Sequence, residues 1–93
     1  MDDAAQLRDL GVMSKSLITL AAAFGEIVRK RRLASGWTQE ELANRAGVHR
    51  TYVGDLENGR KSPTLDVVEA LAHALGCPAH ELVAEAEREG GNR

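Results

Sequence analysis

The sequence predicts an all-α protein, a compact domain of five helices that follows a short N-terminal extension. Apolar residues make up 43% of the chain but aromatic residues only 3%, so Ala, Leu and Val supply most of the bulk. This composition favours helices that pack closely through small side chains. Apolar positions recur at helical spacing, and glycines follow the segments that carry them. The 93 residues support one hydrophobic core, so we expect a single domain.

The first predicted helix covers residues 16–35. Its apolar residues recur at helical spacing: Leu20, Phe24, Ile27 and Val28. Gly36 then stands where a left-handed residue closes a helix. Residues 1–15 are expected to be an extension that is mobile or forms a short helix. The folded domain is expected over residues 16–86, with a flexible tail at residues 87–93.

A capping box marks the start of the second predicted helix. The Thr38 hydroxyl can accept a hydrogen bond from the amide of Glu41, and the Glu41 carboxylate can reach back to the amide of Thr38. We therefore expect a helix over residues 39–46, which Gly47 ends with a positive φ. A third helix is predicted over residues 50–57.

The last two predicted helices follow a basic loop at residues 60–63. Thr64 is a suitable N-cap for the fourth helix, and Gly76 ends it. The apolar residues of the fourth helix form one stripe: Leu65, Val68, Leu71, Ala72 and Leu75. Pro78 suits the first turn of a fifth helix, which is predicted over residues 79–86.

Charge is distributed unevenly along the chain. The net charge of −2 argues against a nucleic-acid partner, because Lys and Arg supply most of the affinity for phosphates. Residues 29–61, however, hold eight Lys and Arg against four acidic residues, and the rest of the chain is acidic. Such a distribution is typical of a basic binding face. The run at residues 29–32 also complements the dipole of the first helix, which by itself explains it; a targeting signal or a phosphate contact is the alternative.

Composition and spacing disfavour several classes of protein. Cys77 is the single cysteine, and we expect it to be a small buried residue, without a disulfide or a metal. The apolar stretch at residues 15–25 lacks a basic start and is shorter than the ~20 residues of a membrane span, so we expect a cytoplasmic protein with no membrane contact. The three histidines are not spaced as a metal set, and no nucleophile lies near a base. We therefore expect no enzyme and no cofactor.

The second and third helices combine the features of a tight helix-turn-helix crossing. Small Ala43 is fifth, counting from Gln39, and Gly47 is ninth; apolar Val53 and Leu56 are fifteenth and eighteenth. With these residues, the stretch TQEELANRAGVHRTYVGDLENGRKSPTLDVVEALAHALG resembles the lambda repressor/Cro-like (XRE-type) helix-turn-helix family. The segment HRTYVGDLE is also similar to the recognition helix of restriction–modification controller proteins. The resemblance implies a lambda-repressor-like DNA-binding domain, a sequence-specific transcriptional regulator whose third helix enters the major groove of double-stranded DNA.

The resemblance also implies roles for individual residues. Arg50 and Thr51 would read base edges, and the Arg50 guanidinium could donate two hydrogen bonds to a guanine. Asp55 is a third base-reading candidate and a departure from the family, because phosphate repels a carboxylate. It could accept from a cytosine amino group or pair with Arg50 or Arg60, and we favour the pairing. Contacts to the DNA backbone are implied for Thr38, Gln39, His49, Tyr52, Asn58, Arg60 and Lys61.

Two of these positions keep a second interpretation, and Arg31 adds a question about packing. His49 replaces the usual Ser or Asp of an N-cap and could contact phosphate or simply be exposed. Lys61 could likewise be a solvated side chain. Arg31 stands where many relatives have leucine, which raises a question about how the first helix packs.

A regulator of this kind normally needs a second copy. One module buries only ~600–1,000 Å² on DNA, so we expect a homodimer on a two-fold operator. Leu82 and Val83 are the expected dimer interface, and Leu17 and Ile18 are further candidates. No small-molecule effector is expected. The alternative function is the antitoxin half of a toxin–antitoxin pair, in which the same fold masks a toxin.

Overall fold

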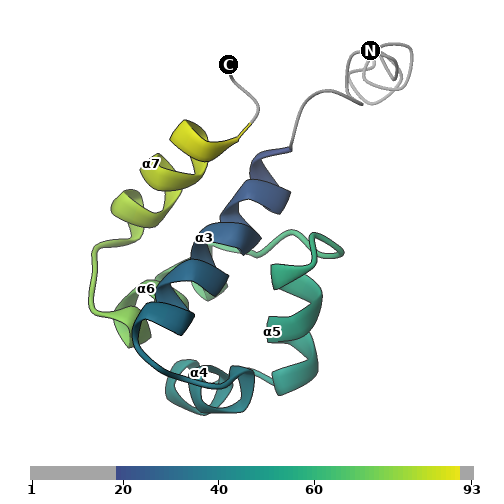
Figure 1. The fold of residues 1–93 in the computed structure, drawn as a ribbon, viewed down its shortest axis with the longest axis vertical. Helices are drawn as coiled ribbons and strands as arrows, with labels where there is room; N and C mark the ends of the chain where they lie inside the picture. Colours follow the sequence, from purple (N-terminus) through teal and green to yellow (C-terminus); the bar gives the residue numbers. More distant parts are fainter. Residues whose placement is uncertain (1–18, 91–93) are drawn as a thin grey trace.

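The computed structural model describes residues 19–90, and this part of the chain forms five helices and no strand. The helices are α3 (Leu20–Ala34), α4 (Gln39–Ala46), α5 (Arg50–Glu57), α6 (Leu65–Leu75) and α7 (Ala79–Glu89), shown in Figure 1. The predicted all-α class is therefore confirmed. The expected extension at residues 1–15 and the last tail residues lie outside the described residues. None of the five helices is both long and apolar enough to cross a lipid bilayer.

The helix boundaries agree with the sequence except at the two ends. The bounds of α4 and α5 are as predicted, and α6 begins after Thr64, whose hydroxyl accepts from the amide of Val67 at 3.1 Å. The first helix begins at Leu20 and not at residue 16, because Thr19 has extended backbone and caps the helix. The last helix was predicted to end at residue 86 and continues to Glu89, so the tail begins later than expected.

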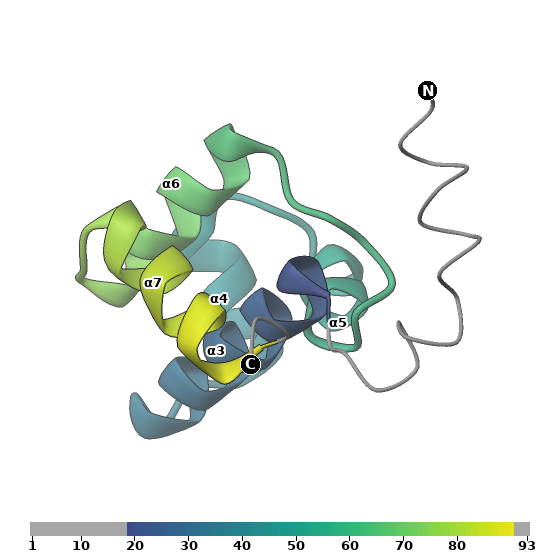
Figure 2. The same ribbon diagram turned by 90° about the horizontal axis from the view of Figure 1, so that it is seen from above.

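The core lies around α3, which runs between α5 on one side and α7 on the other (Figures 1 and 2). Its largest fully buried side chains come from all five helices: Val28, Leu42, Val53, Leu56, Leu71 and Leu82. The predicted stripe on α6 is wrong at its first residue, since Leu65 is 84% exposed. Leu65 is the first residue of α6 and borders an open apolar hollow with Leu20 and Val83.

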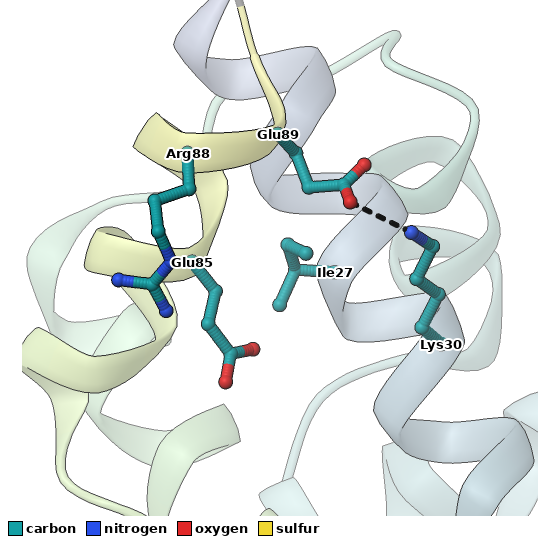
Figure 3. A pocket seen from close by; sticks show the side chains of 5 residues that line it. All are labelled: Ile27, Lys30, Glu85, Arg88 and Glu89. Atoms are coloured by element: carbon teal, nitrogen blue, oxygen red, sulfur yellow. Dashed lines mark hydrogen bonds and ion pairs between the residues drawn. The ribbon is translucent and has the colours of Figure 1, made fainter.

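Charged residues join α3 to α7. Lys30 donates to Glu89 at 2.9 Å, a contact drawn in Figure 3 beside Ile27 and Glu85. Arg31 donates to Glu85 at 3.0 Å through Nε and also pairs with Glu81 through Nη2 at 3.0 Å. The hydrogen bond from Arg31 lowers the pKa of the Glu85 carboxyl below its ordinary value. These contacts answer the question that Arg31 raised, because acids on α7 receive its guanidinium.

Candidate nucleic-acid interface

Helices α4 and α5 cross tightly, as the sequence predicts. Gly47 has φ of 76° and donates to the carbonyl of Ala43 at 2.8 Å, and Val48 donates to the same carbonyl at 3.0 Å. Ala43 is 1% exposed, and Val53 is fully buried on the facing helix. A small residue, a left-handed glycine and inward apolar anchors thus produce the helix-turn-helix geometry.

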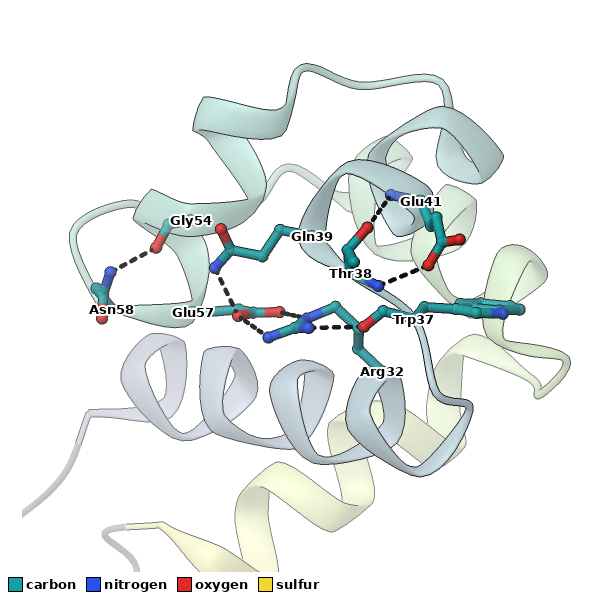
Figure 4. Close-up of polar contacts among 8 residues, drawn as sticks. All are labelled: Arg32, Trp37, Thr38, Gln39, Glu41, Gly54, Glu57 and Asn58. Carbon is teal, nitrogen blue, oxygen red and sulfur yellow. Dashed lines mark hydrogen bonds and ion pairs between the residues drawn. The ribbon is translucent and has the colours of Figure 1, made fainter.

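The N-terminus of α4 is held by the predicted capping box, which Figure 4 shows. Thr38 donates its backbone N–H to Glu41 Oε1 at 2.8 Å, and its hydroxyl accepts from the Glu41 amide at 3.0 Å. Thr38 itself is exposed at the start of the helix. The amides of this first turn carry the positive end of the helix dipole, which favours an anion.

A buried polar network that sequence reasoning missed connects α3, α4 and α5 (Figure 4). Arg32 donates to Glu57 twice, from Nε at 2.8 Å and from Nη2 at 3.1 Å. Its Nη1 donates to the carbonyl of Trp37 at 2.8 Å. Gln39 completes the network by donating Nε2 to Glu57 Oε1 at 3.0 Å. The Glu57 side chain is 1% exposed and that of Arg32 is 9% exposed, so this is a buried ion pair.

The sequence carried a signal for this pair, although a partial one. Arg32 follows buried Val28 by one helical turn and therefore continues the inward face of α3. Arg31 likewise follows buried Ile27 by one turn, so this spacing by itself does not single out Arg32. The choice of Glu57 as partner depends on how α3 and α5 cross, which no local pattern shows.

Close approaches at two glycines position α5. Gly25 of α3 lies against the end of α5, and a Cβ built there would be 2.0 Å from the carbonyl oxygen of Leu56. Gly54 lies beside the side chain of Gln39, whose Oε1 would be 3.5 Å from such a Cβ. Helix α5 is thus supported from α3 and from the start of α4, where the side chain of Gln39 lies beside Gly54 and donates to Glu57.

The first turn of α5 presents its polar residues outward. His49, Arg50 and Thr51 are exposed, and His49 makes no side-chain capping bond. Among residues 19–90, no carboxylate pairs with Arg50. Arg50 also borders a hollow of about 530 Å³ with residues at the start of α4: Arg32, Thr38, Gln39 and Glu40.

The end of α5 and the following loop gather further polar groups. Arg60 Nη1 lies 3.6 Å from Asp55 Oδ1, and the Arg60 amide donates to the Asp55 carbonyl at 2.8 Å. The predicted pairing of Asp55 is therefore present, with Arg60 as the partner. Asn58 donates Nδ2 to the carbonyl of Gly54 at 3.0 Å. Lys61 lies over the ring of half-buried Tyr52, 5.9 Å from its centroid.

The predicted dimer residues need a correction. Leu82 has no exposed surface and belongs to the core, so it cannot contact a partner; its position one turn from buried Ala86 places it on the inward face of α7. Val83 is half-buried and borders an apolar hollow of about 270 Å³ beside exposed Leu20 and Leu65. Leu17 and Ile18 lie outside the described residues.

The braced helix, its exposed polar first turn and the tight α4–α5 crossing define a DNA-binding helix-turn-helix protein. A helix-turn-helix family model matches residues 28–82, which is more than half of the chain. The chain belongs to this family, the XRE-type helix-turn-helix transcriptional regulators.

Named relatives include controller proteins and other regulators. The chain is 41% identical over 61 residues to control protein C.BamHI of Bacillus amyloliquefaciens, a match that covers 64% of this chain and 75% of that protein. The clp gene regulator ClgR of Corynebacterium glutamicum superimposes with a TM-score of 0.73 at 32% identity, over 76% of each chain. The restriction–modification controller protein C.AhdI of Aeromonas hydrophila superimposes with a TM-score of 0.65 at 39% identity, over 67% of this chain and 94% of that one.

Proposed function

We propose that this regulator reads a two-fold operator as a homodimer, with α5 in the major groove of each half-site. The observation that carries the proposal is Arg50: it is exposed, has no carboxylate partner among the described residues, and stands in the first turn of a helix braced from two sides. A planar guanidinium in that position suits guanine O6 and N7. Thr51, beside it, is the second base-reading residue.

Asp55 is a third base-reading residue, but its contact with Arg60 limits that role. Its carboxylate lies 3.6 Å from Arg60, so a cytosine amino group would have to compete with that guanidinium. Arg60 is largely exposed, with 69% of its side chain accessible, and such pairs are weak in water. We therefore expect Asp55 to read a base only where Arg60 turns towards a phosphate.

The DNA backbone would be bound on both sides of α5. Thr38, Gln39 and the first amides of α4 lie beside the hollow that Arg50 borders, where the helix dipole favours a phosphate. Asn58, Arg60 and Lys61 are exposed at the other end of α5. His49 and Tyr52 flank the base-reading turn, and we assign them to the groove edge.

Substitutions at Arg50 and Lys61 test the division between base reading and phosphate binding. Arg50→Ala should weaken binding to the DNA upstream of the protein's own gene by about 1–3 kcal/mol and change binding to random DNA much less. Lys61→Ala should weaken both by a similar factor and reduce the salt slope by about one. Equal losses on both DNAs for Arg50→Ala would refute base reading by that residue.

We propose that the two copies of the dimer contact each other through the apolar surface formed by Leu20, Leu65 and Val83. A single module of this size gives limited specificity, and this surface holds two of the three large exposed apolar side chains of the described residues. Leu65→Asp should therefore shift the protein to monomer and weaken operator binding.

Leu33→Asp is the matched control, because Leu33 is 51% exposed at the other end of α3. Sedimentation velocity should show a dimer for the wild type and for Leu33→Asp. A fully dimeric Leu65→Asp would exclude this surface, and a wild type that stays monomeric on its DNA would exclude the dimer.

The similarity to controller proteins suggests which genes this chain regulates. Control protein C.BamHI and controller protein C.AhdI are similar to this chain over most of the helix-turn-helix domain. We propose controller-like regulation of its own or a neighbouring operon. Footprinting on the DNA upstream of its gene would locate the operator.

A further inference from the structure

The four consecutive cations at residues 29–32 have different contact partners in the folded protein. Lys30 pairs with Glu89, and Arg31 pairs with two carboxylates of the same helix, α7. Arg32 is buried against Glu57. Three of the four charges are therefore already neutralised inside the molecule.

Arg29 is the exception. It is exposed, and no carboxylate among residues 19–90 pairs with it. The dipole of α3 does not require its charge in particular, because Arg31 and Arg32 already occupy the last turn. An exposed guanidinium without an intramolecular partner is available to an external anion.

The position of Arg29 relates it to the proposed DNA-binding face. It follows Gly25 by one turn, and Gly25 touches the backbone at the end of α5. Arg29 accordingly lines a hollow of about 450 Å³ with Asn58, the C-cap of α5. The Glu57 carboxylate at this hollow is compensated by Arg32 and is almost fully buried. The hollow therefore continues the backbone-contacting surface from the end of α5 onto α3.

We propose that Arg29 binds a DNA phosphate at this hollow, so that the footprint extends beyond the helix-turn-helix to α3. This inference rests on the proposed function. A phosphate contact is sequence-independent and releases counterions, so it should raise affinity for any duplex and appear in the salt dependence of binding. Glu26, which lines the same hollow, would repel that phosphate.

Neighbouring residues provide a matched set of variants. The full chain and the variants Arg29→Ala, Lys30→Ala and Glu26→Gln would be titrated by fluorescence anisotropy against a 30-base-pair random duplex and against the upstream DNA over a series of KCl concentrations. Arg29→Ala should bind both DNAs more weakly, and the slope of log affinity against log salt should fall by about 0.9. Lys30 also lines this hollow, but its ammonium donates to Glu89 of α7 at 2.9 Å. Lys30→Ala therefore removes the same charge from a residue that already has an acidic partner, and should keep the wild-type slope. Glu26→Gln should strengthen binding, a change of opposite sign that damage to the fold would not produce.

The outcomes separate this inference from the proposed function. A wild-type slope for Arg29→Ala, an equal loss of slope for Lys30→Ala, or binding of Glu26→Gln no tighter than the wild type would overturn the phosphate contact while the proposed function stands. A wild type without salt-dependent binding to either DNA would overturn both. Urea unfolding of each variant checks that the compared proteins are folded.

Discussion

Replacement of Arg32 by methionine should destabilise the domain more than any surface substitution. The change leaves Glu57 buried, with Gln39 at 3.0 Å as its one remaining side-chain donor among residues 19–90, and removes the donor to the Trp37 carbonyl. The Glu57 carboxyl group would then lack its counter-ion in a site where its side chain is 1% exposed. A buried charge without its counter-ion lacks the hydration that it would have in the unfolded chain.

The expected loss is a large share of the total stability. Removing one partner of a buried ion pair costs about 3–5 kcal/mol. A domain of about 70 residues has a free energy of unfolding of about 4–11 kcal/mol. Arg32→Met should therefore be marginally folded at 25 °C. Arg32→Lys should lie between it and the wild type, because the ammonium keeps the charge and loses the bidentate geometry.

Urea unfolding followed by far-UV circular dichroism would measure these losses in a double-mutant cycle. We expect Glu57→Met to be destabilised as well, and the variant that combines Arg32→Met with Glu57→Met to be about 2–3 kcal/mol more stable than the sum of the single losses. The reason is that the double variant leaves no buried charge. Losses that simply add would refute the conclusion that the two side chains act as a pair.

Three further predictions concern packing and pH. Ala43→Leu should cost about 1–3 kcal/mol of stability through overpacking at the α4–α5 crossing, and an unchanged melting temperature would contradict that placement. Gly25→Ala should lower the melting temperature more than Gly47→Ala. A Cβ at Gly25 would lie 2.0 Å from a backbone oxygen, whereas at Gly47 nothing lies within 4 Å and the cost is that of the positive φ alone. A Gly25→Ala protein that melts at the wild-type temperature would exclude the close approach of α3 to α5. Arg31→Met should reduce stability at neutral pH. Arg31 lowers the pKa of Glu85 in the folded protein. The stabilisation is therefore present above the pKa that Glu85 has in the unfolded chain, and it is lost as pH falls through the pKa that Glu85 has in the folded protein. The wild type and Arg31→Met should thus have the same stability in acid, and a difference in urea midpoints that does not change with pH would argue against this ion pair.

Much of the local structure could be predicted because its causes are local. The capping box at Thr38 and the left-handed Gly47 depend on residues within one turn, so the bounds of α4 and α5 agree with the prediction. The ends of the domain were less predictable. α7 continues to Glu89, whose carboxylate pairs with Lys30 on α3, an interaction across 59 residues that periodicity does not reveal.

In the candidate site, too, some features could be predicted from the sequence and others could not. Exposure of Thr51 in the first turn of α5 follows from helical phase, since Val53 and Leu56 set the opposite, buried face. Arg50 stands three residues before Val53, so helical phase alone does not predict its exposure, which the structure shows. The bond from Gln39 to Glu57 and the burial of Arg32 could not be derived, because they depend on how three helices meet. Leu82 was placed on an interface for the same reason: its sequence pattern shows an apolar face but does not show what covers that face.

The sequence by itself determined the helices, their caps and turns, and the family, since each depends on short-range hydrogen bonds and on the spacing of apolar residues along one helix. Tertiary structure alone decided what each cation of residues 29–32 does. Successive residues of a helix point about 100° apart, so four equivalent charges face different neighbours: two meet acids of α7, one enters the core and one is left towards solvent. Their partners come from elements 25 to 59 residues away, and only the packing of those elements assigns them.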